Sequence, residues 1–253
     1  MRSWTELLRP LVPVPVRVRV ALTRRALRDV RSGARWSMVG VGSAAAVEAW
    51  PERVSVSQSL GRSSYLEGKR HNLALAIRRL QDVRVPPGRL FSFWRLVGSP
   101  SRRRGFVDGR NLVGGALMAS EGGGLCQLSG LIHLMALRAG LQVVERHPHS
   151  VDLYTEETRF APLGSDATVV YGYKDLRLRN VLPFPVALRF HLEEDRLTGS
   201  LHAPAPVETF DVEFVTRDAP DARHVTAWRQ RPGASAKDLL GTSRYARPAA
   251  KAP

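Results

Sequence analysis

The sequence predicts a single α+β domain in which a cysteine-bearing helix packs on a mainly antiparallel sheet. Helical patterns fill the first half of the core, alternating strand patterns follow Gly140, and the two types do not alternate as they would in a βαβ design. The chain has 253 residues and is 43% hydrophobic, which is enough for a sizeable buried core. We expect this core domain over residues 52–218, between a basic N-terminal extension (1–51) and a flexible basic C-terminal tail (219–253).

The helical half contains two predicted helices. The first covers residues 69–80, where Leu73, Ile77 and Leu80 recur at helical spacing. A Pro-Pro-Gly turn at 86–88 and a short aromatic strand over 90–94 follow. Residues 102–124 are rich in glycine and predict a long functional loop. The second helix begins near Cys126 and ends at Gly140, which suits a left-handed cap.

The strand-rich half begins at residue 141. Residues 141–154 alternate in their second part, which predicts that His149, Val151 and Leu153 share one face. Further strands are predicted over 166–171 and 186–192, and residues 197–202 are expected to close a hairpin.

The positive charge is concentrated at the two ends of the chain. The net charge is +15, of which residues 1–36 carry +7 and residues 229–253 carry +5. A nearly neutral body argues against a globular nucleic-acid-binding face, so no specific nucleic acid is expected as a partner. Residues 21–30 predict either a basic amphipathic helical turn resting on an anionic membrane surface or part of a mobile basic tail.

The apolar segments predict no membrane span and no signal peptide. The most apolar N-terminal run, residues 11–22, is interrupted by two arginines and two prolines. We therefore expect a cytoplasmic protein, and the basic N-terminus leaves open a peripheral position on the inner face of the membrane.

Cys126 is the most informative residue, because it is the only cysteine and follows three glycines at a helix start. A single cysteine excludes an intramolecular disulfide, and the amides of a first helical turn stabilise a thiolate. His149 on the next strand and Asp166 beyond it supply a base and an orienting group. The order Cys, His, Asp matches that of papain-like and transglutaminase-like enzymes, so we predict these three as catalytic residues, with Gln127 or the amides of residues 124–126 binding an oxyanion.

Other interpretations of the same residues stay open. Cys126 is equally compatible with a small buried side chain, and His149 with a hydrogen-bonded core histidine. We predict neither a metal nor a cofactor; the runner-up chemistry is a transition metal held by Cys126, His147, His149 and Asp166. A ligand groove would use the glycines and the polar side chains around them, for which the substrate-binding candidates are Gly122, Gly123, Gly124, Gln127, Ser129, His147 and Ser150.

A series of motifs in fixed order resembles the VanW family. The motifs are Arg70-x-Asn72, Pro87-Gly88-x-x-Phe91-Ser92-Phe93-Trp94, Gly122 to Ser129, Glu145-Arg146-His147-x-His149-Ser150, Asp166 to Val169, and Asp175-Leu176 ending at Asn180. The resemblance covers about residues 69–201. It implies an accessory role in cell-wall metabolism or glycopeptide resistance, and a cell-wall precursor or related peptide as partner.

Three functions follow from these observations. The first is a cysteine-dependent acyl-transfer enzyme, either a hydrolase or a transpeptidase, acting on a wall-precursor peptide. The second is a non-catalytic binding module with a glycine-rich groove, and the third is a membrane-surface scaffold. Convergence of Cys126, His149 and Asp166 in space would distinguish the first from the second.

Overall fold

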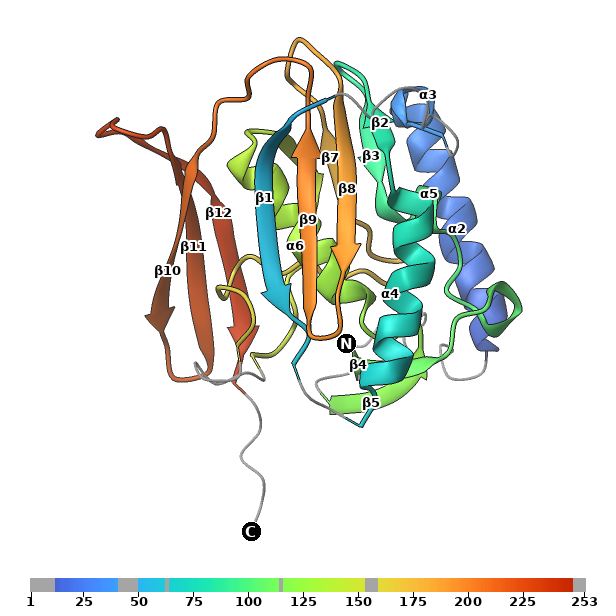
Figure 1. The fold of residues 1–253 in the computed structure, drawn as a ribbon. Coiled ribbons are helices and arrows are strands. Elements are labelled where there is room, and N and C mark those ends of the chain that lie inside the picture. Colours follow the sequence, from blue (N-terminus) through green and yellow to red (C-terminus); the bar gives the residue numbers. More distant parts are fainter. Residues whose placement is uncertain (1–11, 41–49, 62–63, 114–115, 153–158, 248–253) are drawn as a thin grey trace.

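A four-stranded antiparallel sheet forms the centre of the fold (Figure 1). The computed structural model describes residues 12–40, 50–61, 64–113, 116–152 and 159–247. The sheet order is β1–β9–β8–β2, and the strands are β1 (Glu52–Ser59), β9 (Arg196–His202), β8 (Val186–Leu192) and β2 (Val83–Val85). The predicted strand over 186–192 and the hairpin with 197–202 are confirmed.

Two helices pack against this sheet and supply much of the core. They are α4 (Leu66–Leu80) and α6 (Leu125–Arg138), and both confirm predicted helices. Leu131 of α6 packs on Gly199 of β9, where a Cβ would lie 2.3 Å from the leucine Cδ2. Gly140 follows α6 with φ of 71°, as the left-handed cap requires.

A second sheet has the order β3–β7–β6, formed by β3 (Leu90–Ser92), β7 (Arg177–Arg179) and β6 (Gln142–Glu145). The predicted aromatic strand is shorter than expected, because α5 (Phe93–Val97) begins immediately after Ser92. The Ser92 hydroxyl accepts a hydrogen bond from the Arg95 amide, which caps this helix.

The glycine-rich segment is more ordered than the predicted loop. After the short 3₁₀ helix η2 (Arg102–Arg104), β4 (Asp108–Val113) and β5 (Ala116–Glu121) form an antiparallel hairpin. The predicted strand over 166–171 is wrong: residues 166–169 form no ladder, and Val170 makes only an isolated bridge to Lys174. In the predicted 141–154 strand, regular pairing stops at Glu145, Val151 forms one bridge to Ala246, and Leu153 lies outside the described residues.

The expectation of a flexible C-terminal tail is wrong for residues 219–246. A third sheet, β10–β11–β12, comprises β10 (Asp211–Asp218), β11 (Ala222–Gln230) and β12 (Lys237–Ala246). Tyr245 on β12 is fully buried. The sequence did not predict this sheet because its strands are largely exposed and carry no apolar stripe. They are held together by cross-strand pairing.

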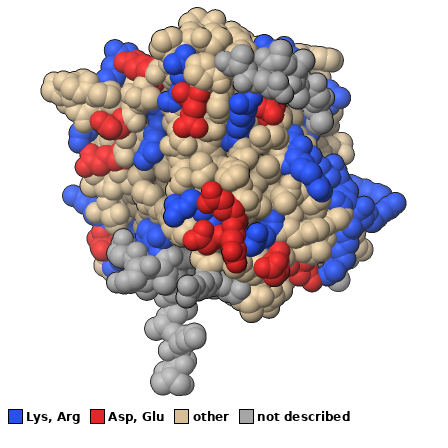
Figure 2. Space-filling view, viewed as in Figure 1, with Lys and Arg blue, Asp and Glu red and all other residues tan. Residues whose placement is uncertain are grey.

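The N-terminal region contains a long helix, α2 (Val14–Arg31), followed by α3 (Ala34–Ser37). The predicted helical turn over 21–30 is part of α2. The alternative prediction, a mobile basic tail, is wrong for residues 14–31, which are helical. No helix in the described part of the chain is long and apolar enough to cross a membrane. Lys and Arg side chains gather along the right edge of the view in Figure 2, the side on which Figure 1 places α4 and α2.

Candidate functional site

The start of α6 is fixed by a tight turn over Gly122–Gly124. Gly122 and Gly124 have φ of 76° and 100°, values that favour glycine. Gly123 packs on the backbone of β4, since a Cβ there would lie 2.1 Å from the carbonyl carbon of Gly109. The Asn72 amide of α4 donates to the Gly123 carbonyl at 3.0 Å. The turn therefore holds Cys126 on the first turn of a rigid, buried helix.

The three predicted catalytic residues converge at this point. The His149 ring Nδ1 lies 2.7 Å from Asp166 Oδ2, and the same oxygen accepts the His149 backbone N–H at 2.7 Å. This pairing leaves Nε2 as the other ring nitrogen, and Cys126 lies near enough to raise the pKa of the imidazole. The Cys126 Sγ also lies 3.8 Å from the Val169 carbonyl oxygen. All three side chains are partly exposed.

The electrostatics of the site favour a charged imidazole. Burial alone would lower the pKa of His149, but hydrogen bonds and charge from Asp166 and Cys126 outweigh it and raise the pKa to about 10. Burial would likewise raise the pKa of Asp166, whereas His149, Arg146 and Tyr245 hold it well below its usual range. The geometry therefore stabilises an imidazolium between a carboxylate and a sulfur.

Two further residues complete the site around Asp166 and were not predicted. Arg146 donates from Nη2 to Asp166 Oδ1 at 2.9 Å and from Nε to the Asp166 carbonyl oxygen at 2.7 Å. The Tyr245 hydroxyl donates to the same Oδ1. Arg146 stands beside His147 in the recognised motif, which was an available signal, but the sequence around Tyr245 offered none.

The residues predicted to bind substrate have contacts within the fold. Gln127 donates from its side-chain amide to the Ser59 carbonyl at 2.8 Å, and Ser129 donates to the Ala167 carbonyl. The Ser150 carbonyl accepts the Ala246 amide at 2.8 Å. These contacts position the residues, and a role for them or for the three glycines in substrate binding stays a prediction.

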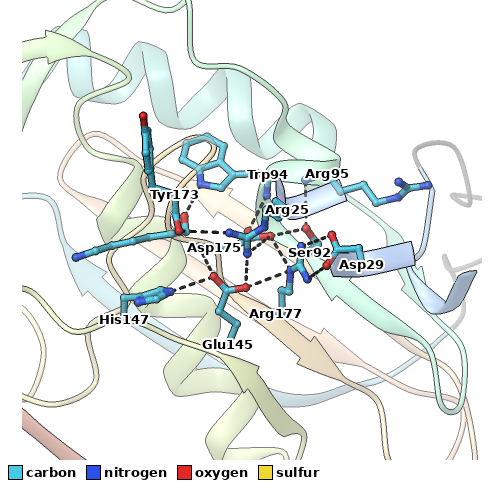
Figure 3. Close-up of polar contacts among 11 residues, drawn as sticks. Arg25, Asp29, Ser92, Trp94, Arg95, Glu145, His147, Tyr173, Asp175 and Arg177 are labelled. Carbon is cyan, nitrogen blue, oxygen red and sulfur yellow. Dashed lines mark hydrogen bonds and ion pairs between the residues drawn. The ribbon is translucent and has the colours of Figure 1, made fainter. Parts of the chain in front are cut away.

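His147 belongs to a different cluster from His149. Its Nε2 lies 3.0 Å from Glu145 Oε1, and the other oxygen of Glu145 pairs with Arg25 and Arg177 (Figure 3). Burial would raise the pKa of Glu145, but hydrogen bonds from Arg25 and His147 lower it. Of the two candidate histidines, only His149 therefore faces the Cys126 side chain within the described contacts.

A third histidine, His133, lies on α6 behind Cys126. It is buried, its Nδ1 lies 2.8 Å from the Ser165 carbonyl oxygen, and burial lowers its pKa to about 4. Within the described residues no group of three or more His, Cys, Asp and Glu side chains is arranged to hold a metal ion.

A surface cleft lies beside Arg146, which bonds to Asp166. It has a volume of about 640 Å³ and runs between β6 and β12, with Arg146, Pro148, Leu239 and Ser243 among its lining residues. Cys126, His149 and Asp166 do not line it. The cleft is therefore separate from the group formed by these three residues.

Comparison with known proteins fits the order of these motifs. The family described as VanW-like protein matches residues 68–202, which is more than half of the chain. The chain belongs to the VanW family. This VanW-family chain is 33% identical over 139 residues to the vancomycin B-type resistance protein VanW of Enterococcus faecalis, covering 55% of this chain and 50% of that protein. It is also 33% identical over 138 residues to the uncharacterized protein YoaR of Bacillus subtilis, covering 53% of this chain and 44% of YoaR.

The chain thus spans about half the length of the curated relatives it matches. No solved structure matches it. The likeness to papain-like and transglutaminase-like enzymes is accordingly limited to the order of Cys, His and Asp along the chain.

Proposed function

We propose that this VanW-family protein is a cysteine-dependent acyl-transfer enzyme acting on a peptide or amide bond of a cell-wall precursor. The observation that carries the proposal is the chain of contacts from Cys126 through His149 to Asp166. Nucleophilic cysteines depend on such a base, and the base depends on a group that orients it. The substrate class rests on the relative from Enterococcus faecalis, which is named for vancomycin resistance.

In the proposed reaction, the Cys126 thiolate attacks the carbonyl carbon and forms a tetrahedral intermediate. The His149 imidazolium then gives its proton to the leaving amine, and the acyl group remains on sulfur as a thioester. Water or a second amine attacks the thioester while His149 takes up the proton, which releases a carboxylic acid or a new amide. Asp166 keeps the Nδ1 proton in place throughout this sequence.

The first turn of α6 supplies donors for the oxyanion. Among the described residues, no acceptor is paired with the backbone amides of Gly124 and Cys126, whereas the Leu125 and Gln127 amides bond to carbonyls of the glycine turn. The Gln127 side-chain amide is already bonded to Ser59, so the backbone amides are the better candidates. A single oxyanion donor of this type typically contributes about 3 kcal/mol to the transition state.

The first experiment measures the rate of Cys126 alkylation by iodoacetamide from pH 5 to 10 in the wild type, His149→Gln and His191→Gln. His191 is an exposed control histidine. We expect the wild type and the control to be alkylated faster than His149→Gln, because His149 is the neighbouring base that would activate the thiol. A profile shared by all three proteins would contradict the nucleophile assignment and favour a binding module.

The second experiment tests the substrate. The wild type and Cys126→Ser are incubated with a peptidoglycan-precursor pentapeptide, and intact-protein mass spectrometry follows an acyl adduct on Cys126. The expected result is a transient adduct in the wild type alone. A reactive thiolate without any adduct or product would leave the catalytic site in place and refute this substrate.

A further inference from the structure

The long helix α2 is docked on the protein through a face that carries two apolar and two charged side chains. The Asp29 carboxylate accepts two hydrogen bonds from the Arg177 guanidinium, at 2.6 and 2.7 Å. Arg25 pairs with Glu145 and lies 3.6 Å from Asp175 (Figure 3). Val18 and Leu22 fill the space above Gly172, where a Cβ would lie about 3.5 Å from each. These four residues, spaced 18, 22, 25 and 29, form one face of the helix.

The opposite face of α2 is exposed and mostly apolar, with Thr23 as its one polar residue. Val16, Val20, Leu27 and Val30 have exposed fractions of 46%, 44%, 51% and 46%, and no residue of α2 is buried. At about 100° per residue, these four side chains fall within an arc of about 80°, centred about 150° from the docked face. A surface helix normally turns its apolar stripe towards the core. The docking of α2 instead leaves this second apolar stripe in contact with solvent.

Arginines border this apolar stripe on both sides. The helical positions place Arg19 along one border and Arg24 and Arg31 along the other, and all three side chains are exposed. The only acidic residue of α2, Asp29, is on the docked face and bonded to Arg177. A second copy of the helix would therefore place arginines next to arginines, which repel. An anionic lipid surface offers phosphates to the arginines and an apolar interior to the valines and leucine.

We propose that α2 is a membrane-surface anchor that binds anionic phospholipid. Val16, Val20, Leu27 and Val30 enter the boundary between headgroups and acyl chains, and the flanking arginines bind lipid phosphates. The Arg25 and Asp29 ion pairs fix the body of the protein to the rear of the helix, so the whole fold is held at the bilayer surface. This proposal is independent of the cysteine chemistry and stands if that chemistry fails.

The test uses the full chain and sedimentation with phosphatidylglycerol-rich or pure phosphatidylcholine vesicles. Val20→Glu combined with Leu27→Glu changes the apolar face of α2. The matched control, Val215→Glu combined with Leu239→Glu, makes the same change of charge at two exposed apolar residues on β10 and β12. Unfolding midpoints and Cys126 alkylation rates verify that both variants remain folded.

We expect the wild type and the control to bind phosphatidylglycerol-rich vesicles, and the α2 variant to bind at least about tenfold more weakly. Binding of the wild type should weaken with added salt and be lost on pure phosphatidylcholine. Equal binding by both variants, or no binding by the wild type, would overturn the proposal. A concentration-dependent dimer that the α2 substitutions abolish, in a protein that ignores vesicles, would assign the face to a second copy instead.

Discussion

The substitution Asp166→Asn tests the core of the site, because four donors converge on this one carboxylate. Oδ1 accepts from Arg146 and Tyr245, and Oδ2 accepts from the amide and the ring of His149. An asparagine of the same shape has one acceptor oxygen, and its amide group would face donors. The substitution therefore breaks about half of the hydrogen bonds and leaves the Arg146 charge without its partner.

The expected loss of stability follows from those contacts. Removing one member of a buried ion pair costs about 3–5 kcal/mol. Asp166 and Arg146 retain some exposure, so we place the loss near the lower end, about 3 kcal/mol. Tyr245→Phe removes a hydroxyl that donates to the same oxygen and accepts from Arg146, and a loss of about 1–2 kcal/mol is expected.

Urea unfolding at pH 7 measures both losses, with Asp195→Asn as an exposed control for which no change is expected. Cys126 alkylation at pH 6 should slow in Asp166→Asn, because the His149 imidazolium loses its carboxylate. Wild-type stability and wild-type alkylation in Asp166→Asn would refute the role of this carboxylate as the centre of the site.

Two further predictions concern pH and the glycine turn. The pKa of His149 is raised to about 10 in the folded protein from an ordinary value near 6.5, so its contribution to stability is complete below pH 6.5 and is lost as the pH rises through 10. Unfolding midpoints in urea from pH 6 to 10.5 should therefore fall more steeply in the wild type than in His149→Gln; parallel curves would contradict this. Gly123→Ala should lower the unfolding midpoint strongly, because its Cβ would overlap the Gly109 backbone, whereas Gly40→Ala, with open space around the Cβ, should unfold like the wild type.

The elements predicted well from sequence are those that bury an apolar pattern locally. α6 and the strands β8 and β9 carry continuous buried side chains, and their limits could be inferred to within a few residues. The C-terminal sheet was missed because β10 and β12 expose most of their residues. Both strands are held by backbone hydrogen bonds to β11. Backbone pairing needs no alternation of apolar and polar residues, so the sequence shows little of the pattern typical of a strand.

The same distinction applies to the candidate site. Cys126, His149 and Asp166 could be selected by chemistry and chain order, and the structure brings them together without the strand predicted for Asp166. The motif position of Arg146 gave a signal that it belongs to the site but not what it does there, and Tyr245 gave no signal. Their roles arise from contacts of Asp166 with residues 20 and 79 positions away, which no local pattern encodes.

The position of Tyr245 has a consequence for the order in which the protein is made. Cys126, His149 and Asp166 are all synthesised before residues 211–246, yet Asp166 receives the Tyr245 hydroxyl and Arg146 bonds to Ser243 and Tyr245 on the last strand. A nascent chain that has just completed its family-matched segment therefore contains Cys126, His149 and Asp166 but lacks the two side chains of the last strand that bond to Asp166 and Arg146. The contacts of β12 with Asp166 and Arg146 form only after the last strand has been synthesised. A chain that terminates before β12 cannot make them.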